Sequence, residues 1–332
     1  MRRGLAALVV ATVAVLAANS AAPAQAAGTG DKLTVVASFS ILRDWVANLG
    51  GDRVAVSVLV GPGADAHVYA PPPRDAKIVG AAGLIVVNGF GFEGWMDRLV
   101  QASATRAPVI VASAGIVPMP PSYPALGAKA SRPHLEQAGE TPALPREGRG
   151  DRFGNAAAGI DPHAWQSVRN AEVYVSNIRD GLMRADPQGR ATYEANAAAY
   201  IQELARLDAD IRRAVATIPP ARRKAITTHD AFGYFAADYG IAFVAAQGVS
   251  TETEASARDV ARIIRAIREQ NIPALFFENA VDPRLVKRIA AETGARIGGT
   301  LFSDALTASP GPAATYLDMM RHNIREIVDA LR

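Results

Sequence analysis

The fold class is decided by residues 32–60, which read KLTVVASFSILRDWVANLGGDRVAVSVLV. Lys32–Ala37 predicts a strand, Ile41–Leu49 has the apolar spacing of a helix, and Val54–Val60 predicts a second strand that a Gly-Pro-Gly turn closes. A strand, a helix and a strand in this order form the unit from which parallel sheets are built.

The same alternation recurs on both sides of a long helical region. Further strands are expected at residues 84–87, 108–112, 224–228, 241–246, 274–278 and 295–302, and helices at 74–82, 92–102, 260–270, 283–293 and 313–331. Pro187 is expected to start a helix of about 30 residues, on the order of 45 Å long. The pattern predicts an α/β fold with two lobes, each a parallel sheet covered by helices, joined by this spine helix.

Four parts of the chain follow from this pattern. We predict a signal peptide at 1–26, an N-terminal α/β lobe at 27–186, a linking helix at 187–218 and a C-terminal α/β lobe at 219–332. Within the first lobe, residues 118–159 are rich in Pro, Gly and charge and predict a flexible loop. Because a stiff linking helix resists wide hinge closure, we expect small lobe motions and local ordering of loops.

The N-terminus predicts export to the periplasm. Arg2 and Arg3 precede an apolar run at residues 5–18, and residues 24–26 (AQA) have the small-x-small pattern of a cleavage site. The run is shorter than the roughly 20 apolar residues of a membrane span, so we interpret it as a cleavable signal rather than an anchor. The chain has no cysteine, which excludes disulfides, thiolate metal sites and the lipid-bearing cysteine of a lipoprotein.

Charge argues against nucleic acid as a partner. Removal of Arg2 and Arg3 with the signal peptide leaves 33 basic and 32 acidic side chains, a formal charge of +1. The remaining length suits two lobes of ordinary domain size, and we expect a monomer.

Four residues have the chemistry and the placement of metal ligands. His67, His229 and Asp304 each follow a predicted strand, and His163 stands at the foot of a helical segment. Since open parallel sheets bind ligands beyond the carboxyl ends of their strands, the four are expected to face one cleft, two from each lobe. Three imidazoles and one carboxylate form a tetrahedral set suited to Zn2+, whereas Ca2+ and Mg2+ prefer oxygen. A histidine taken alone is more often a hydrogen-bonded loop or core residue than a metal ligand.

Other polar residues near these four have less certain roles. Asp65, Asp161 and Asp230 either orient imidazoles or form turns and caps, and we favour turns and caps. Glu278 ends an apolar strand and is expected to pair with Arg258 or another cation.

Three further side chains are not expected to bind the metal. Trp165 and Tyr234 are expected to pack near the cleft, and His322 to lie exposed or packed in the last helix.

Four ordered segments resemble the cluster A-I solute-binding proteins, the zinc- and manganese-binding components of ABC importers. They are VLVGPGADAHVY at 58–69, DPHAW at 161–165, THDAFGYF at 228–235 and SDAL at 303–306, with weaker matches at EASA 254–257 and at YLDMM 316–320 with Asn323. The resemblance covers nearly the whole mature chain and implies that the ligand positions fall on the same four residues.

The resemblance also bears on which ion is bound. The manganese type tends to carry Glu at the third ligand position and the zinc type His; His229 therefore favours Zn2+, although affinity order excludes neither Cu2+ nor Ni2+. Many zinc-type members have a loop rich in His and acid before the second ligand. Here that stretch holds only His134 with three glutamates, so it is either a weak accessory site, a mobile flap or a docking segment.

The resemblance implies capture of Zn2+ in the periplasm and its delivery to the permease of an ABC importer in the inner membrane. A periplasmic metal chaperone is a further candidate partner. The alternatives are Mn2+ uptake on the same scaffold, a surface adhesin or chaperone, and a secreted zinc hydrolase. A hydrolase needs an open coordination position and a general base. No His-Glu-x-x-His or nucleophile motif is present, so we expect no enzyme activity.

Overall fold

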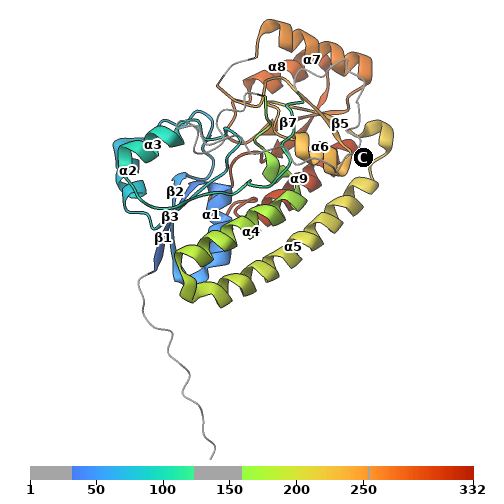
Figure 1. Ribbon diagram of the computed structural model, residues 1–332. Helices are drawn as coiled ribbons and strands as arrows, with labels where there is room; N and C mark the ends of the chain where they lie inside the picture. Colours follow the sequence, from blue (N-terminus) through green and yellow to red (C-terminus); the bar gives the residue numbers. More distant parts are fainter. Residues whose placement is uncertain (1–31, 123–158, 253–254) are drawn as a thin grey trace, which may run out of the picture. The chain divides into compact units, whose positions relative to one another are not determined.

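The computed structural model describes residues 32–122, 159–252 and 255–332. These residues form two four-stranded sheets in which every neighbouring pair of strands is parallel (Figure 1). The first sheet has the order β2-β1-β3-β4, with β1 Leu33–Phe39, β2 Val54–Val60, β3 Leu84–Val87 and β4 Val109–Val111. The second has the order β6-β5-β7-β8, with β5 Lys224–Thr227, β6 Ala242–Ala245, β7 Ala274–Glu278 and β8 Arg296–Leu301. The predicted α/β class with two sheet-based lobes is confirmed.

Helices cover both sheets. Those of the first lobe are α1 Ser40–Gly50, α2 Pro73–Gly80, α3 Met96–Ser103 and α4 Val168–Ala185; those of the second are α6 Gly233–Tyr239, α7 Ala257–Gln270, α8 Arg284–Thr293 and α9 Tyr316–Leu331. Helix α1 packs on β1 and β2, α4 on β3 and β4, and α9 on β8. Gly181 permits the close approach of α4, because a Cβ there would lie 2.6 Å from the side chain of Ile110.

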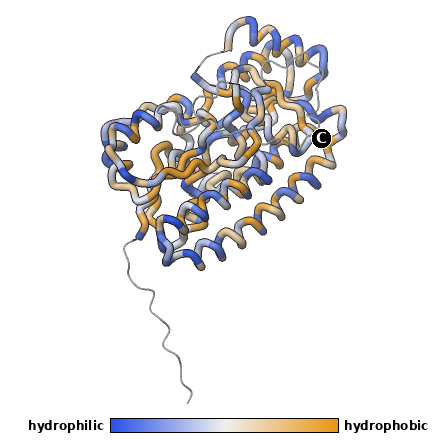
Figure 2. The backbone as a smooth tube through the Cα atoms, in the orientation of Figure 1, coloured by the Kyte–Doolittle hydropathy of each residue, from blue (hydrophilic) through white to orange (hydrophobic). Residues whose placement is uncertain are grey.

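A long helix, α5 Arg190–Ala216, touches helices of both lobes. It follows a short 3-10 turn at Pro187–Gly189 and, with 27 residues, is about 40 Å long. It buries one stripe of side chains at four-three spacing, and it packs against α4, α1 and α9. Figure 1 shows α5 running beside α4. Apolar positions recur along α5 between hydrophilic ones in Figure 2. The predicted spine helix is therefore present.

Some predicted helix ends are displaced for identifiable reasons. The helix expected from residue 92 begins only at Met96, because Gly89 and Phe90 adopt positive φ angles and Glu93 turns inward to accept the Asn88 and Gly89 N–H groups. The last helix begins at Tyr316 rather than at residue 313, because the hydroxyl of Thr315 caps its first turn. Helix α6, one of the shortest, was not predicted.

The predicted signal peptide (1–26), residues 123–158 of the predicted loop, and His134 lie outside the described residues. The lobe boundaries at residues 186 and 218 remain predictions. In the part of the chain that the structure describes, no helix combines the length and the apolar character needed to cross a membrane.

Candidate metal centre

The four residues predicted as ligands converge on one point between the two sheets. The donor atoms of His67, His163, His229 and Asp304 all lie within 4.8 Å of one another. The Nε2 atoms of His67 and His163 are 3.2 Å apart. One carboxylate oxygen of Asp304 lies 3.0 Å from His229 Nε2 and 3.5 Å from His67 Nε2, and the other lies 3.5 Å from His163 Nε2.

The topology explains this convergence. His67 lies in the loop after β2, His229 directly follows β5, and Asp304 follows β8. His163 stands immediately before a 3-10 turn, η2 Ala164–Gln166, that leads into α4. The carboxyl ends of parallel strands from both sheets thus present their loops to one cleft, as such sheets do.

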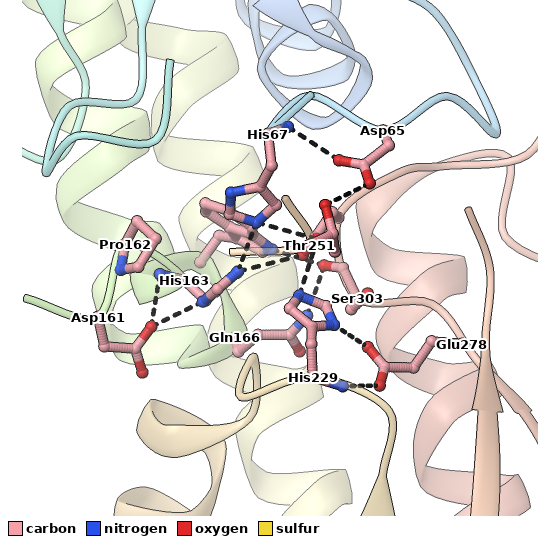
Figure 3. Close-up of polar contacts among 12 residues, drawn as sticks. Asp65, His67, Asp161, Pro162, His163, Gln166, His229, Thr251, Glu278 and Ser303 are labelled. Atoms are coloured by element: carbon pink, nitrogen blue, oxygen red, sulfur yellow. Dashed lines mark hydrogen bonds and ion pairs between the residues drawn. The ribbon is translucent and has the colours of Figure 1, made fainter. Parts of the chain in front are cut away.

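A carboxylate holds the ring of His163. Asp161 Oδ1 lies 2.7 Å from His163 Nδ1 and also accepts the backbone N–H of His163 at 2.9 Å (Figure 3). Gly233 of α6 leaves room for this carboxylate, since a Cβ there would lie 2.5 Å from Asp161 Oδ2. When Nδ1–H is donated to a carboxylate, the Nε2 lone pair is left free to face the centre.

A second carboxylate holds the ring of His229. Glu278 Oε2 lies 2.6 Å from His229 Nδ1, and Glu278 Oε1 accepts the backbone N–H groups of Thr228 at 2.6 Å and His229 at 3.0 Å (Figure 3). Both side chains are fully buried. Glu278 therefore has the expected structural pairing, but its partner is the imidazole of His229 and not Arg258, so the strand end of β7 supports a residue of the centre.

This chain is similar to metal-binding proteins over almost its entire length. The family described as zinc-uptake complex component A, periplasmic (ZnuA), matches residues 35–330. The chain belongs to this family. It is a metal-binding solute-binding protein of an ABC importer, so the resemblance predicted from the sequence segments is confirmed.

Relatives of this ZnuA-family chain are named for three different metals. The iron-binding protein YfeA of Yersinia pestis is 33% identical, over 90% of this chain and 86% of its own length. The manganese-binding lipoprotein MntA of Halalkalibacterium halodurans is 32% identical, over 97% of both chains. The structure of the periplasmic zinc-binding protein TroA from Treponema pallidum superimposes with a TM-score of 0.76 at 31% identity, over 90% of this chain and 99% of its own. Membership of the ZnuA family therefore does not by itself identify the metal ion that this chain binds.

The electrostatics of the ZnuA-family centre favour a cation. Burial lowers the pKa of His67. Burial by itself would lower the pKa of His229 as well, but Glu278 and Asp304 on either side of the ring raise it well above its usual range. Burial disfavours the charged form of Asp304, yet His229 and His163 hold the pKa of this carboxyl well below its usual range. An ionised carboxylate in a buried, imidazole-lined site is suited to a positive ion.

The other polar and aromatic residues that were singled out from the sequence lie at different distances from the centre. Asp65 forms the expected turn by accepting the backbone N–H of His67 at 2.8 Å. Asp161 forms the same kind of turn with the His163 N–H and also orients the His163 ring, so the interpretation favoured from the sequence is incomplete for Asp161. Trp165 is fully buried and packs against the ring of His163, and Tyr234 donates to the Asp161 carbonyl, so both lie beside the centre as expected. His322 Nε2 donates to the Thr300 carbonyl at 3.0 Å and is not part of the cluster of the other three rings.

Two residues that support the Asp304 loop, Gln166 and Asn279, were not found from the sequence. The Ser303 carbonyl accepts from Trp165 Nε1 at 2.8 Å and from Gln166 Nε2 at 2.7 Å. Asn279 accepts the Ser303 N–H and donates to the Ala305 carbonyl. Gln166 follows the DPHAW segment directly, which is the one sequence signal that could have drawn attention to it.

Proposed function

We propose that this chain captures Zn2+ with His67, His163, His229 and Asp304 and delivers it to the permease of an ABC importer. The observation that carries the proposal is the convergence of three imidazole Nε2 atoms and one carboxylate within 4.8 Å. Two ligands come from each lobe, so the ion bridges them. Binding would exchange the protons of the imidazoles for the metal.

Zinc is favoured over manganese by the donor set. Nitrogen donors suit Zn2+, whereas carboxylate, carbonyl and water oxygens suit Mn2+. His229 is the third of these nitrogens, and Glu278 increases its basicity as a ligand. Mn2+ is the second candidate, because a relative 32% identical over 97% of the chain is named manganese-binding.

The proposed role is transport rather than hydrolysis. Four protein ligands fill a tetrahedral zinc site and leave no position for an activated water. Glu278, which could act as a general base, uses both carboxylate oxygens on the backbone and ring of the His229 segment. We further propose that the chain acts in the periplasm as a monomer, after cleavage of the predicted signal peptide. A periplasmic chaperone that loads the site is a further possible partner.

The test is metal uptake by the stripped chain. After removal of metal with a chelator, the protein should bind one Zn2+ per chain and should retain it against an excess of Mn2+, as measured by elemental analysis after desalting. His229→Ala should lose zinc retention, and His322→Ala, which removes a histidine outside the centre, should keep it. Retention of Mn2+ in place of Zn2+ would assign the second candidate ion, and failure to bind either ion would reject the proposal.

A further inference from the structure

His67 is the ligand that lies nearest to solvent. It exposes 9% of its surface, whereas His163 and His229 expose none and Asp304 exposes 3%. Its neighbour Val68 is half exposed. The loop that carries His67 is therefore the more accessible side of the centre.

The opposite side of the centre is held by side chains that bond the backbone. Trp165 and Gln166 both donate to the Ser303 carbonyl, and Asn279 bonds the N–H of Ser303 and the carbonyl of Ala305. Displacing Asp304 would break several buried hydrogen bonds at once, each costly to leave unmade. The Asp304 side is therefore a poor route for release.

Bonds from both lobes hold the His67 loop. Within its own lobe, Trp95 Nε1 donates to the Ala66 carbonyl at 2.8 Å. Across the cleft, the Gly63 N–H donates to the Leu306 carbonyl at 2.9 Å. Thr251 Oγ1, in the segment after β6, donates to Asp65 Oδ2 at 2.6 Å.

Asp65 connects this last bond directly to the ligand. Its Oδ1 accepts the backbone N–H of His67, while its Oδ2 accepts the Thr251 hydroxyl from the other lobe (Figure 3). The Asp65 carboxylate thus fixes the backbone of His67 and fastens it to the facing lobe. A hydrogen bond to a charged acceptor is among the stronger ones.

We infer that the Thr251–Asp65 bond is a latch that sets the rate at which the bound ion leaves the centre. Thr251 and Asp65 are positioning residues: neither touches the ion, and both act through His67. A partner that draws the Thr251 segment away would free the His67 loop and open the path to solvent. This inference rests on the proposed function.

The test is the rate of zinc release. The Zn2+-loaded full chain is mixed with an excess of a colorimetric chelator. The chelator concentration is raised until the observed rate no longer depends on it, so that the rate measured is that of zinc release. Thr251→Val should release zinc about tenfold faster, the factor expected when one hydrogen bond to a charged group is lost. Association should stay within about twofold of wild type, so that the dissociation constant rises in proportion to the release rate.

Two variants separate a latch from a general loss of structure. Thr251→Ser keeps the hydroxyl and should release zinc at the wild-type rate. Ser250→Ala removes the neighbouring hydroxyl, which accepts the Glu252 N–H within the same loop, and should also match wild type. Asp65→Asn weakens the acceptor while keeping its shape and should accelerate release, which provides a second test if Thr251→Val folds poorly.

Three results would overturn the inference. They are a Thr251→Val variant that releases zinc at the wild-type rate, a Ser250→Ala variant that accelerates release equally, and a loss of affinity in Thr251→Val that lies in association. If wild type takes up zinc in these experiments, the proposed function stands and only the latch fails. A wild-type chain that takes up no zinc overturns both.

Discussion

Carboxylates behind the imidazoles determine how two of the ligands face the ion. Glu278 accepts at Nδ1 of His229, and Asp161 does the same for His163. Glu278→Gln places an amide N–H where the ring now donates, which favours the tautomer whose Nε2 carries the hydrogen. We expect zinc affinity to fall about 10- to 100-fold. Competition calorimetry against a chelator of known affinity, at fixed pH, measures the change.

The matched control for this substitution is Glu292→Gln. Glu292 lies on α8 and pairs with Arg288 at the surface, so its zinc affinity should equal that of wild type. A folded Glu278→Gln variant with wild-type affinity would show that Glu278 serves only the backbone of the Thr228–His229 segment.

At the scale of elements, a buried carboxylate joins α1 to α9. Asp44 accepts the Tyr316 N–H at 3.0 Å and a bond from Asn48 at 3.1 Å. Burial raises its pKa to about 6, against the lowering effect of these two bonds. The native state therefore holds this proton more tightly than the unfolded chain, whose value is 3.8. The contribution of Asp44 to the free energy of unfolding is therefore complete below pH 3.8 and is lost as the pH rises through about 6.

Asp44→Asn tests this pH dependence. The amide keeps an acceptor for the Tyr316 N–H but does not titrate in this range. Between pH 4 and pH 7.5 the free energy of unfolding of wild type should fall relative to the variant by up to about 3 kcal/mol. Urea unfolding of both proteins at the two pH values measures this difference; a difference that stays constant with pH would contradict the assignment.

Element positions could be predicted where burial imposes a pattern. Val54–Val60 and Leu84–Val87 match the predicted strands residue for residue. Leu84–Val87 is buried at every position and is a continuous apolar run, whereas the edge strand Val54–Val60 exposes Ala55 and Ser57 between more buried apolar positions. The placement of His229 at a strand end follows from the same pattern. Its partner Glu278 lies 49 residues away, and only the neighbouring positions of β5 and β7 in the sheet bring the two together. Such pairings depend on strand order, which apolar spacing does not encode.

At the scale of the whole molecule, the centre is formed by residues of both lobes. His67 and His163 come from the first lobe, and His229 and Asp304 from the second. An ion that binds all four stabilises the native chain alone, because the unfolded chain does not hold four distant residues together. With zinc at about 1,000 times its dissociation constant, this stabilisation is about 4 kcal/mol.

Stripping the metal should therefore lower the melting temperature by roughly 10 °C, given the size of the chain. Differential scanning calorimetry of the chelator-treated protein, before and after addition of one equivalent of Zn2+, measures the shift. His163→Ala removes a buried ligand of the first lobe and should abolish most of it, while His322→Ala should retain it in full. An equal shift of the melting temperature in wild type and in His163→Ala would place the stabilising ion elsewhere. An ion that joins the lobes through His163 loses this ligand in the variant and can no longer stabilise the chain to the same extent.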